Sequence, residues 1–132
     1  MKSISKVLDD TAVLLQKYVR LKDYSDNGGF CVCVTCGKTG HWKEMDGGHW
    51  ISRVWTKHKI NENNLHVQCK GCNRFSSRIA EQYTMYMIDT YGEDVVRDMI
   101  ATKRDVTKYD RQDLMDMQKD LKAKIKELLN EC

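Results

Sequence analysis

The sequence predicts a mostly helical α+β protein whose small core is stabilised by a bound zinc ion. Two Cys-x-x-Cys pairs offer four thiolates, in a segment rich in glycine, histidine and tryptophan that has no helical period. On both sides of this segment, apolar residues recur at helical spacing. A chain of 132 residues is the size of one domain. We therefore expect an N-terminal helix and turn over residues 1–29, a zinc-bound core over 30–92 and a helical extension over 93–132.

Four segments have the apolar periodicity of a helix. The run Asp23–Gly29 has turn chemistry and closes the first of them, and Gly92 ends the second. The apolar stripe of the last segment packs either on the domain or on a second copy of the chain, so the terminal helices are the candidate interface of a homodimer. The four segments are Ile4–Leu21, Asn73–Tyr91, Glu93–Thr102 and Thr107–Leu129.

The two cysteine pairs predict a structural zinc site. Cys33 and Cys36 form the first pair, and Cys69 and Cys72 form the second, after a 32-residue insertion. Four sulfur ligands close a tetrahedron around Zn2+ and leave no open position for catalysis. Gly37 and Gly71 suit the tight turns of zinc knuckles, and in so small a core the ion contributes directly to folding.

Composition restricts the compartment and the class of zinc protein. No apolar run approaches the roughly 20 residues of a membrane helix, and the N-terminus lacks the apolar block of a signal peptide, so we expect a cytoplasmic protein. In a reducing compartment paired cysteines are metal ligands more often than disulfides, and Cys31 and Cys132 are interpreted as free thiols. A zinc deaminase is excluded, because its signature needs H-x-E and a proline, and both are missing.

Positive charge gathers on the same segment as the cysteines. Residues 38–78 hold eight basic and three acidic residues, whereas the whole chain has a net charge of only +3. This local excess is consistent either with a polyanionic partner or with a solvated basic face.

Three polar residues have the chemistry to hydrolyse a phosphodiester. The reaction needs a base that activates water and a divalent cation that stabilises the phosphate and the leaving oxygen. His49 can be the base, and Asp46 and Asn73 offer the oxygen donors that Mg2+ prefers. Singly, such a histidine also fits a turn or core position, and an asparagine after a knuckle fits a helix N-cap. The spacing of the whole set supports the catalytic interpretation.

The segment from Cys33 to Tyr91 resembles the phage NinG/Rap family of recombination nucleases. The family shows a C-x-x-C pair, an Asp-Ala/Gly-Gly-His segment with an aromatic residue, and then Asn-x-His-x-Gln-Cys-x-x-Cys-Asn. The matching runs here are DGGHWIS at 46–52 and NLHVQCKGCNRF at 64–75, with Tyr83 and Tyr91-Gly92 downstream. The resemblance covers roughly 60 of the 132 residues and fixes many offsets at once.

The resemblance implies a fold, a reaction and a substrate. It implies a ββα-metal (His-Me finger, HNH-like) core, with hydrolysis assisted by Mg2+ or Mn2+. The implied substrate is branched DNA, such as a Holliday junction or a D-loop. By match of motif, His49 becomes the general base and Asn73 a magnesium ligand. A phage origin and the cytoplasm of the host cell are implied in the same way.

A more distant resemblance is to phage endonuclease VII, a Holliday-junction resolvase. That enzyme also has two zinc-binding C-x-x-C pairs, a catalytic histidine between them and an asparagine after the last cysteine. It has an aspartate directly before its histidine, where this chain has Gly48, so Asp46 is left to supply a local carboxylate. Three residues after the asparagine that enzyme has an acidic residue, and this chain has Ser76.

Residues around the proposed site are expected to contact DNA or support the site. Asn64 and His66 are interpreted as support, and Trp42, Trp50 and Trp55 as packing residues rather than base-stacking platforms. Basic side chains beside the site are expected to contact phosphates, which gives salt-dependent affinity with little sequence preference. These are Arg53, Lys57, Lys59, Lys70, Arg74 and Arg78.

Three hypotheses for the function follow. The first is an endonuclease that cuts branched DNA, which we expect to be a homodimer because resolving a junction needs two symmetric cuts. The second is a non-catalytic zinc-ribbon module that binds nucleic acid. The third is an HNH nuclease of another specificity, although no separate sequence-reading domain is visible in the chain.

Overall fold

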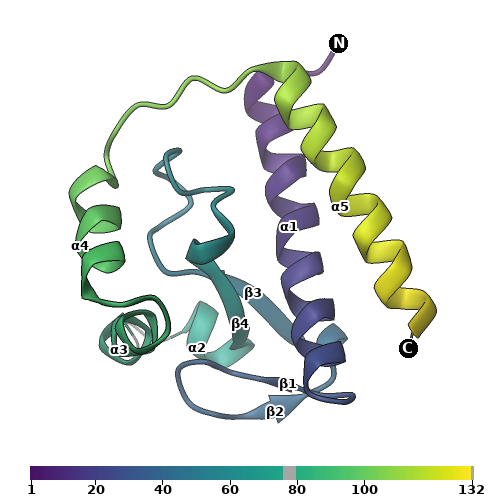
Figure 1. The fold of residues 1–132 in the computed structure, drawn as a ribbon, viewed down its shortest axis with the longest axis vertical. Coiled ribbons are helices and arrows are strands. Elements are labelled where there is room, and N and C mark those ends of the chain that lie inside the picture. Colours follow the sequence, from purple (N-terminus) through teal and green to yellow (C-terminus); the bar gives the residue numbers. More distant parts are fainter. Residues whose placement is uncertain (76–79, 132) are drawn as a thin grey trace.

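The computed structural model describes residues 1–75 and 80–131, and over these residues it confirms a mostly helical α+β architecture. Two small two-stranded sheets lie between a pair of long helices on one side and two shorter helices on the other (Figure 1). In chain order the elements are α1 (Ile4–Asp26), β1 (Cys31–Val32), β2 (Thr39–Gly40), η1 (Trp42–Glu44), β3 (Met45–His49), η2 (Glu62–Asn64), β4 (Leu65–Cys69), α2 (Lys70–Arg74), α3 (Ala80–Tyr91), α4 (Glu93–Thr102) and α5 (Arg111–Glu131).

Helix α1 is capped at its start and is longer than the periodicity predicts. The Ser3 hydroxyl oxygen accepts a hydrogen bond from the amide of Lys6, which satisfies one of the free N–H groups of the first turn. The helix continues past Leu21 to Asp26, because the side chain of Tyr24 packs against the buried cluster around the cysteines. The turn follows at Gly28 and Gly29, which both have positive φ.

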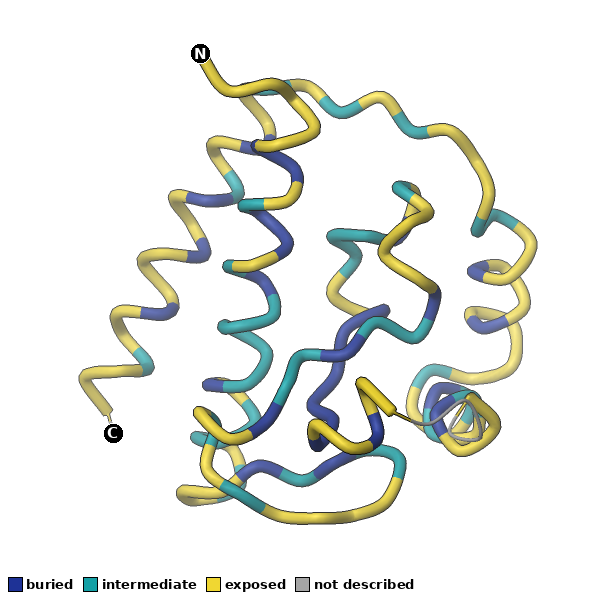
Figure 2. The backbone as a smooth tube through the Cα atoms, turned by 180° about the vertical axis from the view of Figure 1, so that it is seen from behind, coloured by how far each residue is buried: buried dark blue, intermediate teal, exposed yellow. Residues whose placement is uncertain are grey.

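Helix α5 packs along α1, so its apolar stripe lies within the chain (Figures 1 and 2). Leu114, Leu121 and Ile125 are buried there, and the amide of Gln118 donates to the backbone oxygen of Val7. The helix begins at Arg111 rather than Thr107, because the carboxylate of Asp110 caps its first turn. The apolar stripe of α5 therefore packs on the domain itself, which is the first of the two alternatives given above. An interface with a second copy would therefore use another surface.

The two hairpins lie beside α1. Strands β1 and β2 form one antiparallel pair, and β3 and β4 form the other, with Met45 opposite Cys69 and His49 opposite Leu65. All five residues of β4 are buried, and α1 contacts both β3 and β4. Helix α2 follows β4 without a loop, so this part of the chain is two antiparallel strands followed directly by a short helix.

The segment expected as one helix over Asn73–Tyr91 is divided. Helix α2 starts earlier, at Lys70, because the sulfur of Cys69 accepts a hydrogen bond from the amide of Cys72, and it ends at Arg74. Helix α3 then runs over Ala80–Tyr91, and α4 has the expected bounds of Glu93–Thr102. Ser76, Arg78 and Cys132 lie outside the described residues. No helix within those residues is long and apolar enough to span a membrane.

Candidate functional site

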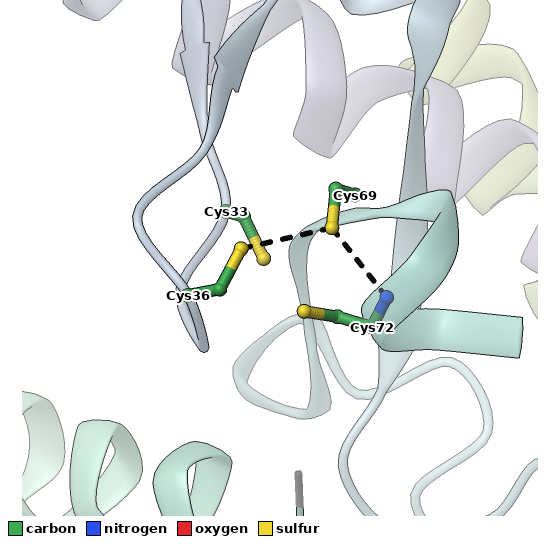
Figure 3. A group of neighbouring side chains, drawn as sticks. All are labelled: Cys33, Cys36, Cys69 and Cys72. Atoms are coloured by element: carbon green, nitrogen blue, oxygen red, sulfur yellow. Dashed lines mark hydrogen bonds between the residues drawn. The ribbon is translucent and has the colours of Figure 1, made fainter. Parts of the chain in front are cut away.

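Four cysteines converge at the end of the β1–β2 hairpin and the start of α2. The sulfur atoms of Cys33, Cys36, Cys69 and Cys72 all lie within 4.8 Å of one another (Figure 3). Those of Cys36 and Cys69 are 3.7 Å apart. Zinc–sulfur bonds of about 2.3 Å in a tetrahedron place sulfurs about 3.8 Å apart, so the donor set fits Zn2+.

The backbone around the sulfurs has the form of two metal knuckles. Amide groups point at sulfur in both, from Lys38 to Cys36 at 3.5 Å and from Cys72 to Cys69 at 3.4 Å. Such donors stabilise thiolate charge. Gly37 has φ of +79°, as a tight knuckle turn requires, whereas Gly71 lies in α2 without positive φ and has no such role.

The remaining described cysteine, Cys31, does not join the cluster. Its side chain is fully buried, and its thiol donates to the backbone oxygen of Arg20 at 3.2 Å. Burial raises the pKa of Cys31 to about 12, so it stays protonated. Four thiolates fill the coordination of one zinc ion, and the ion that they would hold is therefore structural.

A cleft lies beside the four-cysteine cluster, between α1, the β3 strand and α2. It has a volume of about 1460 Å³, and the three residues with the expected chemistry, Asp46, His49 and Asn73, all line it. Asp46 and His49 come from β3, and Asn73 comes from α2, directly after Cys72. A metal ion bound by the four cysteines would hold α2 against the hairpin, and Asn73 with it.

Each of the two adjacent glycines of β3 lets a neighbouring residue come close to the strand backbone. A Cβ at Gly47 would lie 2.5 Å from the Cβ of Gln16, so a side chain there would push α1 away. A Cβ at Gly48 would lie 1.8 Å from the amide oxygen of Gln68 and 2.9 Å from that of Asn73. Real Cβ atoms do not approach so closely, and the two glycines therefore allow α1, Gln68 and Asn73 to reach the strand.

His49 is held by a backbone carbonyl. Its Nε2 lies 2.8 Å from the backbone oxygen of Lys59, and because a carbonyl only accepts, Nε2 carries the proton. In the neutral ring Nδ1 is then a free base, with no hydrogen bond to a described residue. Burial lowers the pKa of His49 below its usual 6.5, and the nearby charges of Arg53 and Lys59 lower it further. The ring is consequently neutral at pH 7.

The loop that carries the Lys59 carbonyl is fixed by a buried asparagine. Asn64 is fully buried and accepts a hydrogen bond from the amide of Ile51 at 2.8 Å. It donates to the backbone oxygens of Ile51 and His58, at 2.9 and 3.1 Å. Asn64 thereby ties both ends of the segment between β3 and β4 together.

Asp46 and Asn73 contact each other directly. The Asn73 amide nitrogen donates to Oδ2 of Asp46 at 3.0 Å, so the Asn73 oxygen is turned away from the carboxylate, toward Gly48. Arg74 binds both carboxylate oxygens, at 2.9 and 3.0 Å. Burial alone would raise the pKa of Asp46, but the bonds from Arg74 and Asn73 outweigh it, and the pKa lies below its usual range.

His66 forms a chain of hydrogen bonds behind the strand. Tyr83 donates its proton to the backbone oxygen of Gly48 at 2.7 Å, so its oxygen accepts from Nδ1 of His66 at 3.0 Å. Nε2 of His66 then accepts from the Tyr91 hydroxyl at 2.6 Å. Helix α3 is thereby linked to β3 one residue before His49.

The cleft has a basic lining that includes two residues, Arg20 and Lys43, that were not among those expected to contact phosphate. Of the residues expected to contact phosphate, Lys57 does not line it and Arg78 lies outside the described residues. Lys59 is paired with Asp9, and Arg74 with Asp46. Arg20 enters the cleft from α1 with no sequence signal, because only the fold brings that helix to the strand. The basic lining residues are Arg20, Lys43, Arg53, Lys59, Lys70 and Arg74.

The three tryptophans have different surroundings. Trp50 donates to the Thr84 hydroxyl at 2.9 Å and packs in the cluster under α3 and α4. Trp42 packs against the cysteine cluster, with the Arg20 guanidinium 5.3 Å from its ring centre. Trp55 is exposed.

Comparison with known proteins identifies the family. A family model described as "Bacteriophage Lambda NinG protein" matches residues 1–131. The Protein ninG of Escherichia phage lambda is 26% identical over 99 residues, which cover 74% of this chain and 48% of that protein. The chain thus matches about half the length of this curated relative. No solved structure matches it. Because the family model extends over nearly the whole sequence, the chain belongs to the NinG family.

Proposed function

We propose that this NinG-family chain is a metal-dependent endodeoxyribonuclease that cuts branched DNA, such as Holliday junctions and D-loops, during recombination in the host cytoplasm. The observation that supports it best is the placement of His49 in a basic cleft, with Nε2 tied to the Lys59 carbonyl and Nδ1 free. The cleft is next to the four-cysteine site. In this proposal β3, β4 and α2 are a ββα-metal core of the His-Me finger type.

His49 acts as the general base. Its Nδ1 takes a proton from a water molecule as the water oxygen forms a bond to phosphorus, and the bond from phosphorus to the leaving oxygen breaks. The lowered pKa keeps the ring neutral, so it is ready to accept this proton at pH 7. The leaving oxygen takes up a proton from solvent, which balances the hydrolysis.

Asn73 and Asp46 would hold the catalytic Mg2+ or Mn2+ through oxygen. Both residues line the cleft with His49, and a hard cation of this kind needs few protein ligands. When bound, the cation stabilises charge on the phosphate and on the leaving oxygen. The four cysteines would hold a structural Zn2+, which would fix the start of α2 and so support this site.

The basic lining gives the cleft affinity for the DNA backbone. Arg53 and Lys70 have no ion pair to a described residue, so they are available to contact phosphates. Branched DNA brings several backbones together and so favours such a surface. Two symmetric cuts require two active sites, and we propose a homodimer that uses surfaces other than the face of α5 packed on α1.

The test is cleavage of a labelled four-way junction and a matched linear duplex in Mg2+. His49→Ala should lower the cutting rate by about 10² to 10⁴-fold, the usual contribution of a general base. Zinc content and junction binding should persist. The matched control is His41→Ala, an exposed histidine that does not line the cleft. For the wild type, cutting should fall as the pH drops through a pKa below 6.5.

The other outcomes separate the hypotheses. Equal cutting of junction and duplex would retain the nuclease and reject the selectivity for branches. Tight binding without cutting in Mg2+ or Mn2+ would instead favour a zinc-ribbon module that binds nucleic acid. Full activity of His49→Ala would reject the assigned base.

A further inference from the structure

We infer that Arg20 is a DNA-binding residue, which holds a backbone phosphate on the α1 wall of the cleft, a few nucleotides from the phosphate at which His49 would act. The inference rests on the proposed function and assigns a role to a residue outside the predicted motifs. The ligand is a phosphodiester of the DNA backbone.

The first support is the way in which α1 brings Arg20 to the cleft. A Cβ at Gly47 would lie 2.5 Å from the Cβ of Gln16, so α1 is seated on β3 at this point. Side chains alternate between the faces of a strand, and Gly47 therefore shares its face with His49. Arg20 follows Gln16 by about one helical turn, and both line the cleft. The helix thus presents Arg20 along the strand that carries His49.

Arg20 lies toward the opposite end of the cleft from His49. The Lys59 carbonyl binds His49, and the Lys59 side chain pairs with Asp9 near the start of α1. Arg20 instead donates from Nη1 to the backbone oxygen of Trp42, just before β3 begins, at 2.8 Å. A strand rises about 3.3 Å per residue, so the start of β3 is about 13 Å from His49. One strand of B-DNA rises about 3.4 Å per nucleotide, and Arg20 would therefore reach a phosphate about three to four nucleotides from the cut.

The second support is the way the Arg20 guanidinium is held. Its Nε donates to the side-chain oxygen of Gln16 at 2.9 Å, and its central carbon lies 5.3 Å from the centre of the Trp42 ring. Its Nη2 bonds no described residue. No buried side-chain nitrogen or oxygen of the described residues lacks a partner, so Nη2 is open to solvent. A guanidinium fixed in this way loses little freedom when it binds a phosphate.

The third support is that positive charge gathers here without a balancing carboxylate. Burial lowers the pKa of Arg20, and the charge of Asp46, whose two oxygens are already bound, offsets this only in part. Lys17 and Lys43 lie 5.8 and 5.7 Å from the centre of the Trp42 ring that Arg20 also covers. None of these three cations has an ion pair within the described part of the chain. Three unpaired cations around one ring favour the binding of an anion.

The experiment measures binding of a labelled four-way junction to the zinc-loaded protein at several salt concentrations, without Mg2+. Arg20→Gln should weaken binding about ten- to a hundredfold at low salt, as loss of a hydrogen bond to a charged group does. It should also lower the slope of log affinity against log salt by about one, because one phosphate contact is lost. Arg20→Lys retains the charge and should keep the wild-type slope. Arg97→Gln removes an exposed arginine of α4, outside the cleft, and should bind as wild type does.

A second measurement uses the wild-type protein. Zinc content and the free energy of unfolding report whether each variant is folded. If Arg20→Gln does not fold, modification of the wild type with phenylglyoxal, which reacts with arginine, decides. Bound junction should protect Arg20 and leave Arg97 reactive. Equal modification of Arg20 with and without the junction would overturn the inference.

The two proposals fail differently. If wild type cuts DNA, and Arg20→Gln binds the junction with wild-type affinity and salt slope, then Arg20 binds no phosphate and the nuclease stands. If Arg20→Gln loses affinity and slope while wild type cuts nothing in Mg2+ or Mn2+, then the phosphate contact stands and the proposed nuclease is wrong.

Discussion

The helix pair α1–α5 and the two hairpins that carry the cysteine cluster are stabilised in different ways. Along the helix pair, leucine and isoleucine side chains interlock, and the buried polar groups are paired, as Gln118 is with Val7 and Thr11. In the hairpin region the buried cluster consists of six residues, and three of these, Cys33, Cys69 and Cys72, belong to the four-cysteine site.

This difference suggests that the helix pair, as the scaffold, and the hairpin region, which carries the candidate site, have separate sources of stability. Apolar packing alone can hold two long helices together. Strands of two to five residues have too little apolar area to do the same, so we expect them to depend on an ion held by the four cysteines. Asn73 follows Cys72 directly, and we therefore expect its place in the cleft to depend on an ion held by the four cysteines, whereas α1 supplies the opposite wall.

The largest effect should come from removing zinc. Chelation, or Cys36→Ser, should unfold the hairpins and α2, because structural zinc contributes on the order of 10 kcal/mol to such modules. Cutting should be lost, and near-ultraviolet circular dichroism from Trp42 should collapse, while part of the helical signal remains. Cys31→Ser is the matched control, since Cys31 lies outside the cluster and should leave one zinc per chain. If zinc removal abolished the entire helical circular dichroism signal, the helix pair and the hairpin region would unfold as one unit, which would contradict this prediction.

The helix pair should respond to loss of packing instead. Leu121 is 3% exposed and packs with Leu15 and Leu65 between α5, α1 and β4. Leu121→Ala should lower the free energy of unfolding by about 2–5 kcal/mol, measured by urea denaturation. Zinc content should be unchanged. Leu129→Ala, on the exposed side of α5, is the control. A Leu121 variant that loses zinc under native conditions would contradict the separation.

The sequence was most informative where the determinants are local. Helix α4 has the expected bounds because Gly92 and the residues after it define its start within one turn. The cysteine spacing identified a cluster that the structure brings within bonding distance of one ion. In both cases the signal lies within a few residues.

The sequence was less informative where distant segments decide the structure. The end of α1 at Asp26 depends on the contact of Tyr24 with the cysteine region. Gln68 approaches Gly48 only because β3 pairs with β4, and Arg20 reaches the cleft only because α1 lies on β3. No periodicity or motif reports such pairings. Two adjacent glycines in a strand, Gly47 and Gly48, are consistent with close contacts to the backbone. The sequence does not indicate which residues make these contacts.

Acid should lower the stability of the contact between α3 and the β3–β4 hairpin, which His66 makes. Burial lowers the pKa of His66 to about 4, whereas an unfolded histidine titrates near 6.5. The unfolded chain therefore takes up a proton first as the pH falls, and the stabilisation present above pH 6.5 is lost between pH 6.5 and 4. His66 alone should account for about 3 kcal/mol of this loss.

The measurement is the free energy of unfolding from urea titrations between pH 4 and 7.5. His66→Gln should flatten the profile in this range, leaving the smaller contributions of His49 and His58, whose pKa values burial also lowers. His41→Ala, at an exposed position, should keep the wild-type profile. A profile as steep in His66→Gln as in wild type would contradict the assignment.

The smallest expected effect concerns one hydroxyl of the same network. Tyr91→Phe removes the donor to Nε2 of His66 and should cost about 1 kcal/mol of unfolding free energy. Tyr24→Phe is the matched control, because the Tyr24 hydroxyl bonds no described residue. If the network positions β3 beside His49, Tyr91→Phe should also slow junction cutting with zinc content and Mn2+ binding unchanged. Loss of stability without any change in cutting would mean that the chain of hydrogen bonds secures α3 to the hairpin and leaves the cleft unaffected.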